Sequence, residues 1–486
     1  MVSQSTSDVK SAVAPSRRRR LFILAICCTS LLLVSMDVTI VNVALPSIHR
    51  AFHASLDGLQ WTLDAYTLVI ACLLMLAGSS ADRFGRKRVF LIGLVVFTAG
   101  SAMCAAAPSL GFLVAARIIQ AIGGSMLNPV AMSIIRTVFD DPRERAQAIG
   151  IWGAVVGISS ALGPVIGGIL VDGPGWRFVF LVNVPIGIVA LVLTKLYVPE
   201  SRAPKARRFD PGGQVLVIIW LATLVYAIIE GARDGWTSGL ILGSFAVALL
   251  SLVGLILYER RQDEPLLELR FFRSIPFASA SLSAICSFAG LGGFLFLATL
   301  YLQSARGFSA LHAGLYSLPM ALTMIVLAPL SGRIVGGSGA RWPLVFAGIF
   351  MAAGSLILLG LNLQTSVILL LVAYFLRGAG VGLVNPPISV IAVSGMPGSQ
   401  AGVAGAIAST SRQIGFALGV AIVGAVSGGT ETGSIGPSFA AATHAGWAVL
   451  SVLGFIVLVL GWISTTKRAL DSAERTAKLF DGSDGK

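Results

Sequence analysis

The sequence predicts an all-α integral membrane protein that crosses the bilayer fourteen times. Of its 486 residues, 56% are hydrophobic and only 12% are charged, and the mean hydropathy is +0.87. A soluble domain carries about 25% charged residues, and it could not bury this much apolar surface in one core. This composition excludes a soluble globular enzyme, a disordered chain and a nucleic-acid-binding domain, and it makes the lipid bilayer the expected surroundings.

A membrane-spanning helix needs about 20 mostly apolar residues. Stretches of this kind occur at 21–45, 59–79, 88–107, 110–133, 147–171, 176–198, 213–231, 238–258, 275–302, 311–333, 342–361, 366–392, 402–427 and 441–464. The seventh and eighth stretches are best explained as a pair inserted between two halves of six helices. The run Arg17 to Arg20 before the first stretch resembles the start of a signal peptide. That stretch continues to about residue 45 without a small-residue cleavage pattern, so we expect a retained first helix.

The predicted organisation has five parts. A cytoplasmic tail (1–20) precedes the first half (21–198), and the two extra helices with cytoplasmic linkers occupy 199–274. The second half (275–464) is followed by a cytoplasmic tail (465–486), in which 468–480 is expected to form a short amphipathic helix. Because one chain contains both halves, we expect a functional monomer.

The distribution of basic residues predicts the orientation. The net charge is +13, from 35 basic and 22 acidic residues. With the N-terminus in the cytoplasm, nearly all basic residues fall in inside segments, as the positive-inside rule requires. The basic residues of the outside segments are Arg50, Arg177, Arg233 and Arg306. The charge therefore indicates a plasma-membrane protein with both termini in the cytoplasm, and not a nucleic-acid-binding protein.

Several kinds of site are not expected. The cysteines lie in apolar runs without a C-x-x-C pair, so neither a zinc site nor a disulfide framework is predicted. No nucleotide-binding G-x-x-x-x-G-K-[ST] loop occurs, so ATP-driven transport is not expected. We expect no metal, no cofactor and no enzymatic activity.

Two sequence patterns recur in the two halves. The stretch LAGSSADRFGRKR (76–88) follows the second span, and LAPLSGRIVGG (327–337) occurs at the corresponding place after the tenth. Likewise QAIGGSMLNP (120–129) in the fourth span is similar to RGAGVGLVNP (377–386) in the twelfth. Two six-helix halves of the same orientation are typical of a secondary transporter that rocks around a midplane site.

The motifs resemble the major facilitator superfamily, and within it the fourteen-helix drug:proton antiporters. The motifs that carry this resemblance are DVTIVNVALP (37–46), GSSADRFGRKR (78–88), RIIQAIGGSMLNP (117–129), GAVVGISSALGPVIGG (153–168), WRFVFLVNVPIG (176–187) and, in the second half, RQIG (412–415). The resemblance implies the major facilitator fold, export driven by the proton gradient without a cofactor, and a functional acid in the first helix. It also implies that the pattern of the fifth helix marks exporters. The residues of that pattern are Gly153, Gly157, Gly163, Pro164 and Gly167.

Ionisable residues inside the spans are candidates for the site, because a charge in the bilayer costs at least about 2.5 kcal/mol. Asp37, Asp64 and Arg117 are expected at one depth, roughly 8–9 Å inside the outer edge. They predict a site for protons and cations with its own counter-charge, in which a lipophilic cation competes with protons. Alternatively, Asp37 makes a packing hydrogen bond to Thr39 or Asn42, Asp64 lies near headgroups, and Arg117 snorkels outward as a structural ion partner.

Two arginines of the second half, Arg377 and Arg412, form a weaker group of candidates. They are expected to bind acidic groups of a substrate or to balance the charge of Asp37. Alternatively, Arg412 bonds carbonyl oxygens at the end of a neighbouring helix. Glu230, at the outer edge of the seventh span, is expected to be exposed to water.

The loop after the second span is predicted to be a cytoplasmic latch that holds the two halves in the outward-facing state. Its glycines permit a tight bend, its aspartate is expected to face a helix N-terminus, and its arginines to meet a carboxylate. A plain positive-inside loop would need neither the aspartate nor the spaced glycines. The residues of the predicted latch are Gly78, Asp82, Arg83, Gly85, Arg86 and Lys87.

The sequence therefore predicts a proton-coupled antiporter that exports small amphipathic toxic compounds, lipophilic and in part cationic, by alternating access. A proton symporter for a small metabolite, a narrow-specificity exporter of an endogenous secondary metabolite and a non-transporting sensor or scaffold are the alternatives.

Overall fold

A computed structural model describes residues 16–203, 210–262, 265–394, 400–428 and 439–481. The basic residues Lys10, Lys205, Arg207 and Arg208 of the predicted inside segments lie outside these ranges. The first half comprises α1 (Arg17–Phe52), α2 (Leu56–Phe84), α3 (Arg86–Ala105), α4 (Leu110–Val138), α5 (Pro142–Asp172), α6 (Phe178–Leu181) and α7 (Asn183–Tyr197). Two further helices follow, α8 (Pro211–Asp234) and α9 (Gly239–Glu259).

The second half begins after a short 3-10 turn, η1 (Leu269–Arg273). It comprises α10 (Ile275–Leu300) with the π turn η2 (Tyr301–Ala305), α11 (Ala310–Tyr316), α12 (Leu318–Ser338), α13 (Arg341–Ile357) with the turn η3 (Leu358–Gly360), α14 (Val367–Val393), α15 (Ala401–Gly428) and α16 (Phe439–Ile463). The chain ends in α17 (Lys467–Asp481).

The fourteen predicted spans are confirmed. In the described part of the chain, 14 helical segments are long and apolar enough to cross a membrane. The sixth span is divided at Val182 into α6 and α7, and the tenth is divided at Ser317 into α11 and α12. The first helix is longer than predicted and continues through Pro46 to Phe52, followed by His53 in the left-handed conformation.

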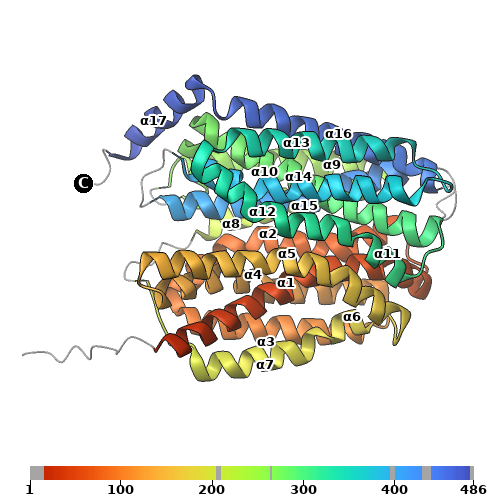
Figure 1. Cartoon of the computed structure of the whole chain (residues 1–486), viewed down its shortest axis with the longest axis horizontal. Coiled ribbons are helices and arrows are strands. Elements are labelled where there is room, and N and C mark those ends of the chain that lie inside the picture. Colours follow the sequence, from red (N-terminus) through yellow and green to blue (C-terminus); the bar gives the residue numbers. More distant parts are fainter. Residues whose placement is uncertain (1–15, 204–209, 263–264, 395–399, 429–438, 482–486) are drawn as a thin grey trace, which may run out of the picture.

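The two halves lie side by side with their helices roughly parallel to one long axis (Figure 1). The first half packs mainly through α1 with α5, α2 with α4 and α3 with α4, and the second through α10 with α15, α13 with α16 and α12 with α14. The start of α1 and the helix α17 lie at the same end of the bundle, which we call the termini end (Figure 1). Because every span reverses direction, the loops after α1, α5 and α10 lie at the opposite end.

Contacts between the halves gather at the end opposite the termini. Gln60 of α2 donates to the carbonyl oxygens of Val420 (3.1 Å) and Ala421 (2.9 Å) of α15. Gln303 donates to the Val43 carbonyl at 2.9 Å. The carboxylate of Asp172 accepts the backbone N–H groups of residues 310 and 311 at 3.0 and 2.8 Å. These polar contacts fasten the halves together at that end.

The glycines of α5 let it approach helices of both halves. A side chain at Gly163 would collide with Thr39 of α1, and one at Gly168 would lie 2.5 Å from the Cα of Leu311. Gly157 faces Ile325 of α12 at 3.1 Å. Gly153 differs from these glycines, because no heavy atom lies within 4 Å of an added Cβ and the position faces open space.

The inserted pair α8–α9 covers one of the two seams between the halves. α8 packs on both α2 and α15. Gln214 donates to the Cys72 carbonyl at 2.7 Å, and the Trp61 indole donates to Glu230 at 2.8 Å. Glu230 is therefore only 6% exposed and also pairs with Arg233, so the expectation that it faces water is wrong. A sequence does not reveal that a neighbouring helix covers a helix end.

The C-terminal amphipathic helix is present as α17. Ser472 accepts the Ile275 backbone N–H at 2.9 Å, and the Phe480 ring packs on Phe271 with 5.4 Å between centroids. α17 is thus docked on the termini end of α10.

The packing of α5 gives a paired test. Gly163→Ala should lower the free energy of unfolding by about 1–3 kcal/mol, because the added methyl group overpacks the contact with Thr39. Gly153→Ala, on the same helix but in open space, should leave stability unchanged or raise it by up to about 1 kcal/mol through helix propensity. Thermal unfolding of the detergent-solubilised variants measures both, and equal midpoints for the two would contradict this packing.

Candidate functional site

A buried ion pair lies at the centre of the first half. The Nη1 of Arg117 on α4 is 2.5 Å from Oδ2 of Asp37 on α1, and both residues are 0% exposed. The alternative partners of Asp37 are not used, since Thr39 donates to the Met36 carbonyl and Asn42 to the Val38 carbonyl. Asp37 and Arg117 therefore lie at one depth, as predicted, and contact each other.

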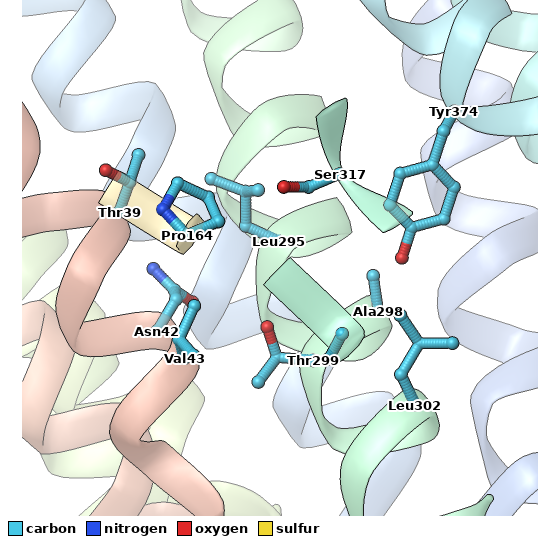
Figure 2. A pocket seen from close by; sticks show the side chains of 11 residues that line it. Thr39, Asn42, Val43, Pro164, Leu295, Ala298, Thr299, Leu302, Ser317 and Tyr374 are labelled. Atoms are coloured by element: carbon cyan, nitrogen blue, oxygen red, sulfur yellow. The ribbon is translucent and has the colours of Figure 1, made fainter. Parts of the chain in front are cut away.

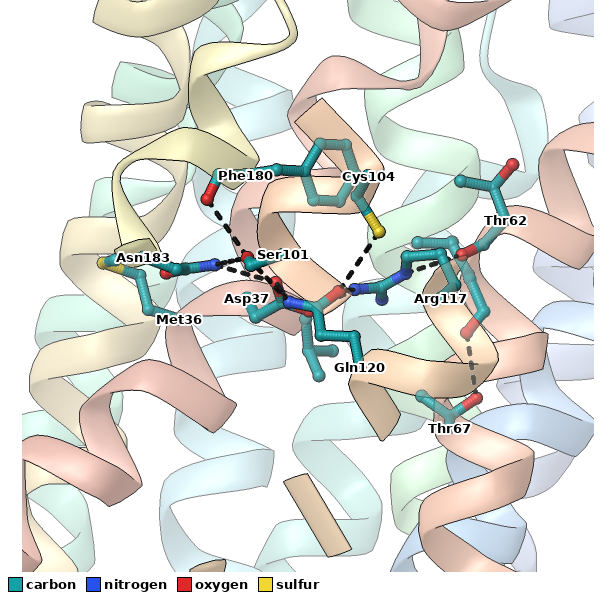
Figure 3. Close-up of polar contacts among 12 residues, drawn as sticks. Met36, Asp37, Thr62, Thr67, Ser101, Cys104, Arg117, Gln120, Phe180 and Asn183 are labelled. Carbon is teal, nitrogen blue, oxygen red and sulfur yellow. Dashed lines mark hydrogen bonds and ion pairs between the residues drawn. The ribbon is translucent and has the colours of Figure 1, made fainter. Parts of the chain in front are cut away.

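Amide side chains complete the surroundings of Asp37 (Figure 3). Gln120 and Asn183 donate to its second oxygen, Oδ1, at 2.8 and 3.1 Å. Both amides also donate to the hydroxyl of Ser101, each at 3.1 Å. The carboxylate thus joins α1 to α4 and α7 directly, and to α3 through Ser101.

Gln120, Asn183 and Ser101 were not predicted as site residues. Each lies inside a sequence motif or an apolar span, and a polar residue in a span is the only signal that the sequence offers. Their common target becomes visible only when three helices are placed around α1.

Arg117 is held on the other side by α2. Its Nε donates to the Thr62 carbonyl at 3.1 Å and its Nη1 to Gln120 at 2.7 Å. The guanidinium lies 4.0 Å from the centroid of the Tyr66 ring, a cation–π distance. Such a fully paired cation has no reason to snorkel, and removing one partner of a buried pair typically costs about 3–5 kcal/mol.

Asp64 does not join this site, contrary to the prediction of a shared cluster. It is 0% exposed, its Oδ1 accepts a weak 3.4 Å bond from Thr67, and its Oδ2 has no hydrogen-bond partner among the described residues. One turn before it, Gln60 contacts α15, so Asp64 lies on the side of α2 that faces the second half. It is buried at the seam between α2 and α15.

Arg377 and Arg412 do not balance Asp37 either. Arg377 is 0% exposed and donates to the carbonyls of Gly290 and Met351 and to Ser355. Arg412 bonds Ser409 of its own helix at 2.8 Å, instead of a neighbouring helix end, and its Nη1 is buried without a partner. Among the described residues, neither arginine forms an ion pair with a carboxylate.

The predicted latch contacts the first half and the segment that directly follows it. Arg86 pairs with Asp82 at 2.9 Å and contacts Thr137 of α4. The expectation that Asp82 faces a helix N-terminus is wrong, because Glu200 occupies that place and accepts the Lys87 backbone N–H at 3.1 Å.

The glycines and the remaining arginine of the latch differ in their surroundings. Gly85 has φ +111°, and an added Cβ would lie 2.7 Å from Glu200, so this position requires glycine. Gly78 is in ordinary contact, 4.0 Å from Pro129. Arg83 lies over the ring of its neighbour Phe84 and has no ion pair among those found in the described chain.

A cavity lies between the halves. Its larger chamber has a volume of about 120 Å³. A smaller chamber of about 20 Å³ (Figure 2) shares Thr39, Pro164, Leu295 and Ser317 with it. These four residues come from α1, α5, α10 and the break between α11 and α12, so both halves build the wall. The sequence analysis predicted Pro164 as part of the site but missed the other three.

The comparisons with known proteins agree with this architecture. Residues 27–420 match the family model described as Major Facilitator Superfamily. The chain belongs to this superfamily.

The relatives include the multidrug resistance protein Stp of Mycobacterium tuberculosis, which is 40% identical over 82% of this chain and 74% of its own length. The tetracenomycin C resistance and export protein of Streptomyces glaucescens is 36% identical over 87% of this chain and 80% of its own length. Their names agree with the subgroup that the motifs predict.

Solved structures share the fold. A bacterial homologue of the human drug peptide transporters PepT1 and PepT2 has a TM-score of 0.66 at 15% identity, covering 94% of this chain and 99% of that one. The inward-open xylose transporter XylE from E. coli has a TM-score of 0.63 at 15% identity, covering 94% and 99%.

The ion pair can be tested by a double-mutant cycle. Asp37→Asn and Arg117→Gln should each lower the free energy of unfolding by about 3–5 kcal/mol, because each leaves one buried charge uncompensated. The double variant should recover much of that loss. Thermal unfolding in detergent measures the cycle, and additive losses would mean that the two groups do not interact.

Proposed function

We propose that this protein is a proton-coupled antiporter that exports small amphipathic toxic compounds across the plasma membrane by alternating access. The observation that carries the proposal is a cavity built by both halves, with polar contacts between the halves gathered at one end of the bundle. The names of the relatives support a drug as the substrate. With both termini in the cytoplasm, the fastened end faces outward and the conformation is inward-facing.

Proton uptake at Asp37 supplies the coupling step in this proposal. A protonated Asp37 no longer balances Arg117, so the bonds that hold α1, α2 and α4 must rearrange. The opposite side of α1 lines the cavity through Val34, Ser35 and Thr39. A shift of α1 therefore links the charge state of Asp37 to the shape of the cavity without direct contact between proton and substrate.

The latch fits the same cycle. In the inward-facing conformation it contacts α4 of the first half and Glu200 of the segment that follows this half. In the outward-facing state we expect its free arginine, Arg83, to meet the second half. The proton gradient is the proposed energy source, with no cofactor.

A narrow-specificity exporter of an endogenous secondary metabolite is the second candidate. It is favoured by relatives named for one product each, such as the tetracenomycin C protein and the probable actinorhodin transporter of Streptomyces coelicolor. The two candidates differ only in the breadth of the substrate range.

Proton flux tests the proposal. In inverted vesicles, adding a transported compound should release protons from the interior in wild type, and Asp37→Asn should abolish this release while the protein stays in the membrane. Asp234→Asn, a partly exposed acid at the opposite end, is the matched control and should behave as wild type. Export by Asp37→Asn at the wild-type rate would exclude the coupling role of Asp37, and uptake instead of export would favour the symporter.

Asp64 gives a separate prediction. Because its carboxylate has no counter-charge in the described part of the chain, Asp64→Asn should leave the midpoint of thermal unfolding unchanged or raise it, whereas Asp37→Asn lowers it. If Asp64 carries a second proton, the variant should also change the pH profile of transport. An unchanged pH profile would assign Asp64 a structural role.

A further inference from the structure

We propose that the cargo is an uncharged, lipophilic molecule that carries hydroxyl or other hydrogen-bond-donor groups, and not a cation. This inference rests on the proposed export function and names the class of substrate that the cavity accepts. It replaces the expectation, drawn from the buried acids, that cations compete with protons for one site.

The first argument is the chemistry of the wall. Within the described residues, neither chamber is lined by a charged side chain. The polar lining consists of hydroxyl and amide groups, and Phe288, Phe416 and aliphatic side chains supply much of the remainder. A cation that enters a largely apolar site needs a counter-charge to offset its lost hydration, and this wall offers none.

The second argument is the placement of the acids. Asp37 is enclosed by Arg117, Gln120 and Asn183, all in the first half. Its neighbours Val38 and Thr39 line the cavity, whereas Asp37 does not, because successive side chains of a helix point about 100° apart. Asp64 lies at the seam between α2 and α15 and lines neither chamber. The two acids are therefore out of reach of a bound substrate in this conformation.

The third argument is the sign of the buried charges in the second half. Arg377 is buried and Arg412 half-buried, with its Nη1 shielded from water, and neither has a carboxylate partner among the described residues. Arg412 precedes Gln413, which lines the larger chamber. Because buried charges are weakly screened, this side of the cavity disfavours a cation.

The fourth argument is a pair of acceptors that have no donor. Asn42 is 1% exposed, and its Nδ2 donates to the Val38 carbonyl, which fixes its Oδ1 as an acceptor. That oxygen is buried without a partner in the described chain, as is the Oδ1 of Asn128. Asn42 lines the smaller chamber (Figure 2) and Asn128 the larger. A buried acceptor is costly unless it receives a hydrogen bond, so both oxygens select a donor-bearing ligand.

A matched pair of compounds tests the charge. A hydroxylated anthraquinone with a neutral hydroxyethyl arm and the same ring system with a trimethylammonium-ethyl arm are offered to proteoliposomes under an imposed pH gradient. We expect transport of the neutral compound and at least tenfold slower transport of the cation. Ser160→Asp, which places a carboxylate in the larger chamber, should reduce this difference.

A second experiment tests the acceptors. Methylating the hydroxyl groups of the neutral compound should raise its KM about tenfold in wild type, because the loss of about one hydrogen bond weakens binding by about that factor. In Asn42→Leu/Asn128→Leu the two compounds should have similar KM values. Gln364→Leu, which removes an exposed amide outside the cavity, should retain the wild-type difference.

The outcomes separate the inference from the proposed function. Transport of the cation or of an anionic sulfonated analogue in preference to the neutral compound would overturn the inference and leave export intact. If methylation leaves the KM of wild type unchanged, the two asparagines are not the acceptors for the hydroxyl groups of the substrate. If no neutral, cationic or anionic compound moves or releases protons, the export function fails and the inference fails with it.

Discussion

The arrangement of the first half depends on one constraint, the burial of a carboxylate and a guanidinium in a bundle without water to solvate them. Asp37 and Arg117 meet this constraint by pairing with each other and by hydrogen bonding to groups of α2, α4 and α7. The result is a polar centre inside an apolar bundle, in which each group depends on the others. A change in the charge of Asp37 therefore alters hydrogen bonds to several helices at once.

The described residues of the second half contain no equivalent ion pair. At the position that matches Gln120 in the repeat it carries Arg377, whose partners are backbone carbonyls and a serine. The buried ion pair of Asp37 and Arg117 thus lies in the first half, while both halves build the cavity wall. The carboxylate that can bind a proton is therefore separate from the surface that can hold a substrate. One side of α1 carries Asp37 and another side lines the cavity, so α1 connects the two.

Much of the fold could be predicted from the sequence, because apolar runs, basic loops and repeated motifs are local signals. Depth along a helix was also predictable, and it brought Asp37 and Arg117 to one level. Depth alone also groups Asp64 with them, although the direction of its side chain around α2 takes it toward α15. Neighbours decided the remaining differences: α2 and α8 bury Glu230, Glu200 takes the place expected for Asp82, and Gly153 meets no helix. Such outcomes depend on which helices are adjacent, and no local pattern encodes that.

The position of the α8–α9 pair has a consequence for access from the lipid phase. A bundle of two halves has two lateral seams, and hydrophobic molecules partition into the membrane before they reach a protein. α8 closes the seam between α2 and α15 and is bonded to α2 through Gln214 and Glu230. The seam formed by α5 with α11 and α12 has no such cover in the described chain. For a molecule dissolved in the bilayer the two seams therefore differ. One seam is covered by α8, and at the other, along the glycine-lined side of α5, the halves face lipid directly.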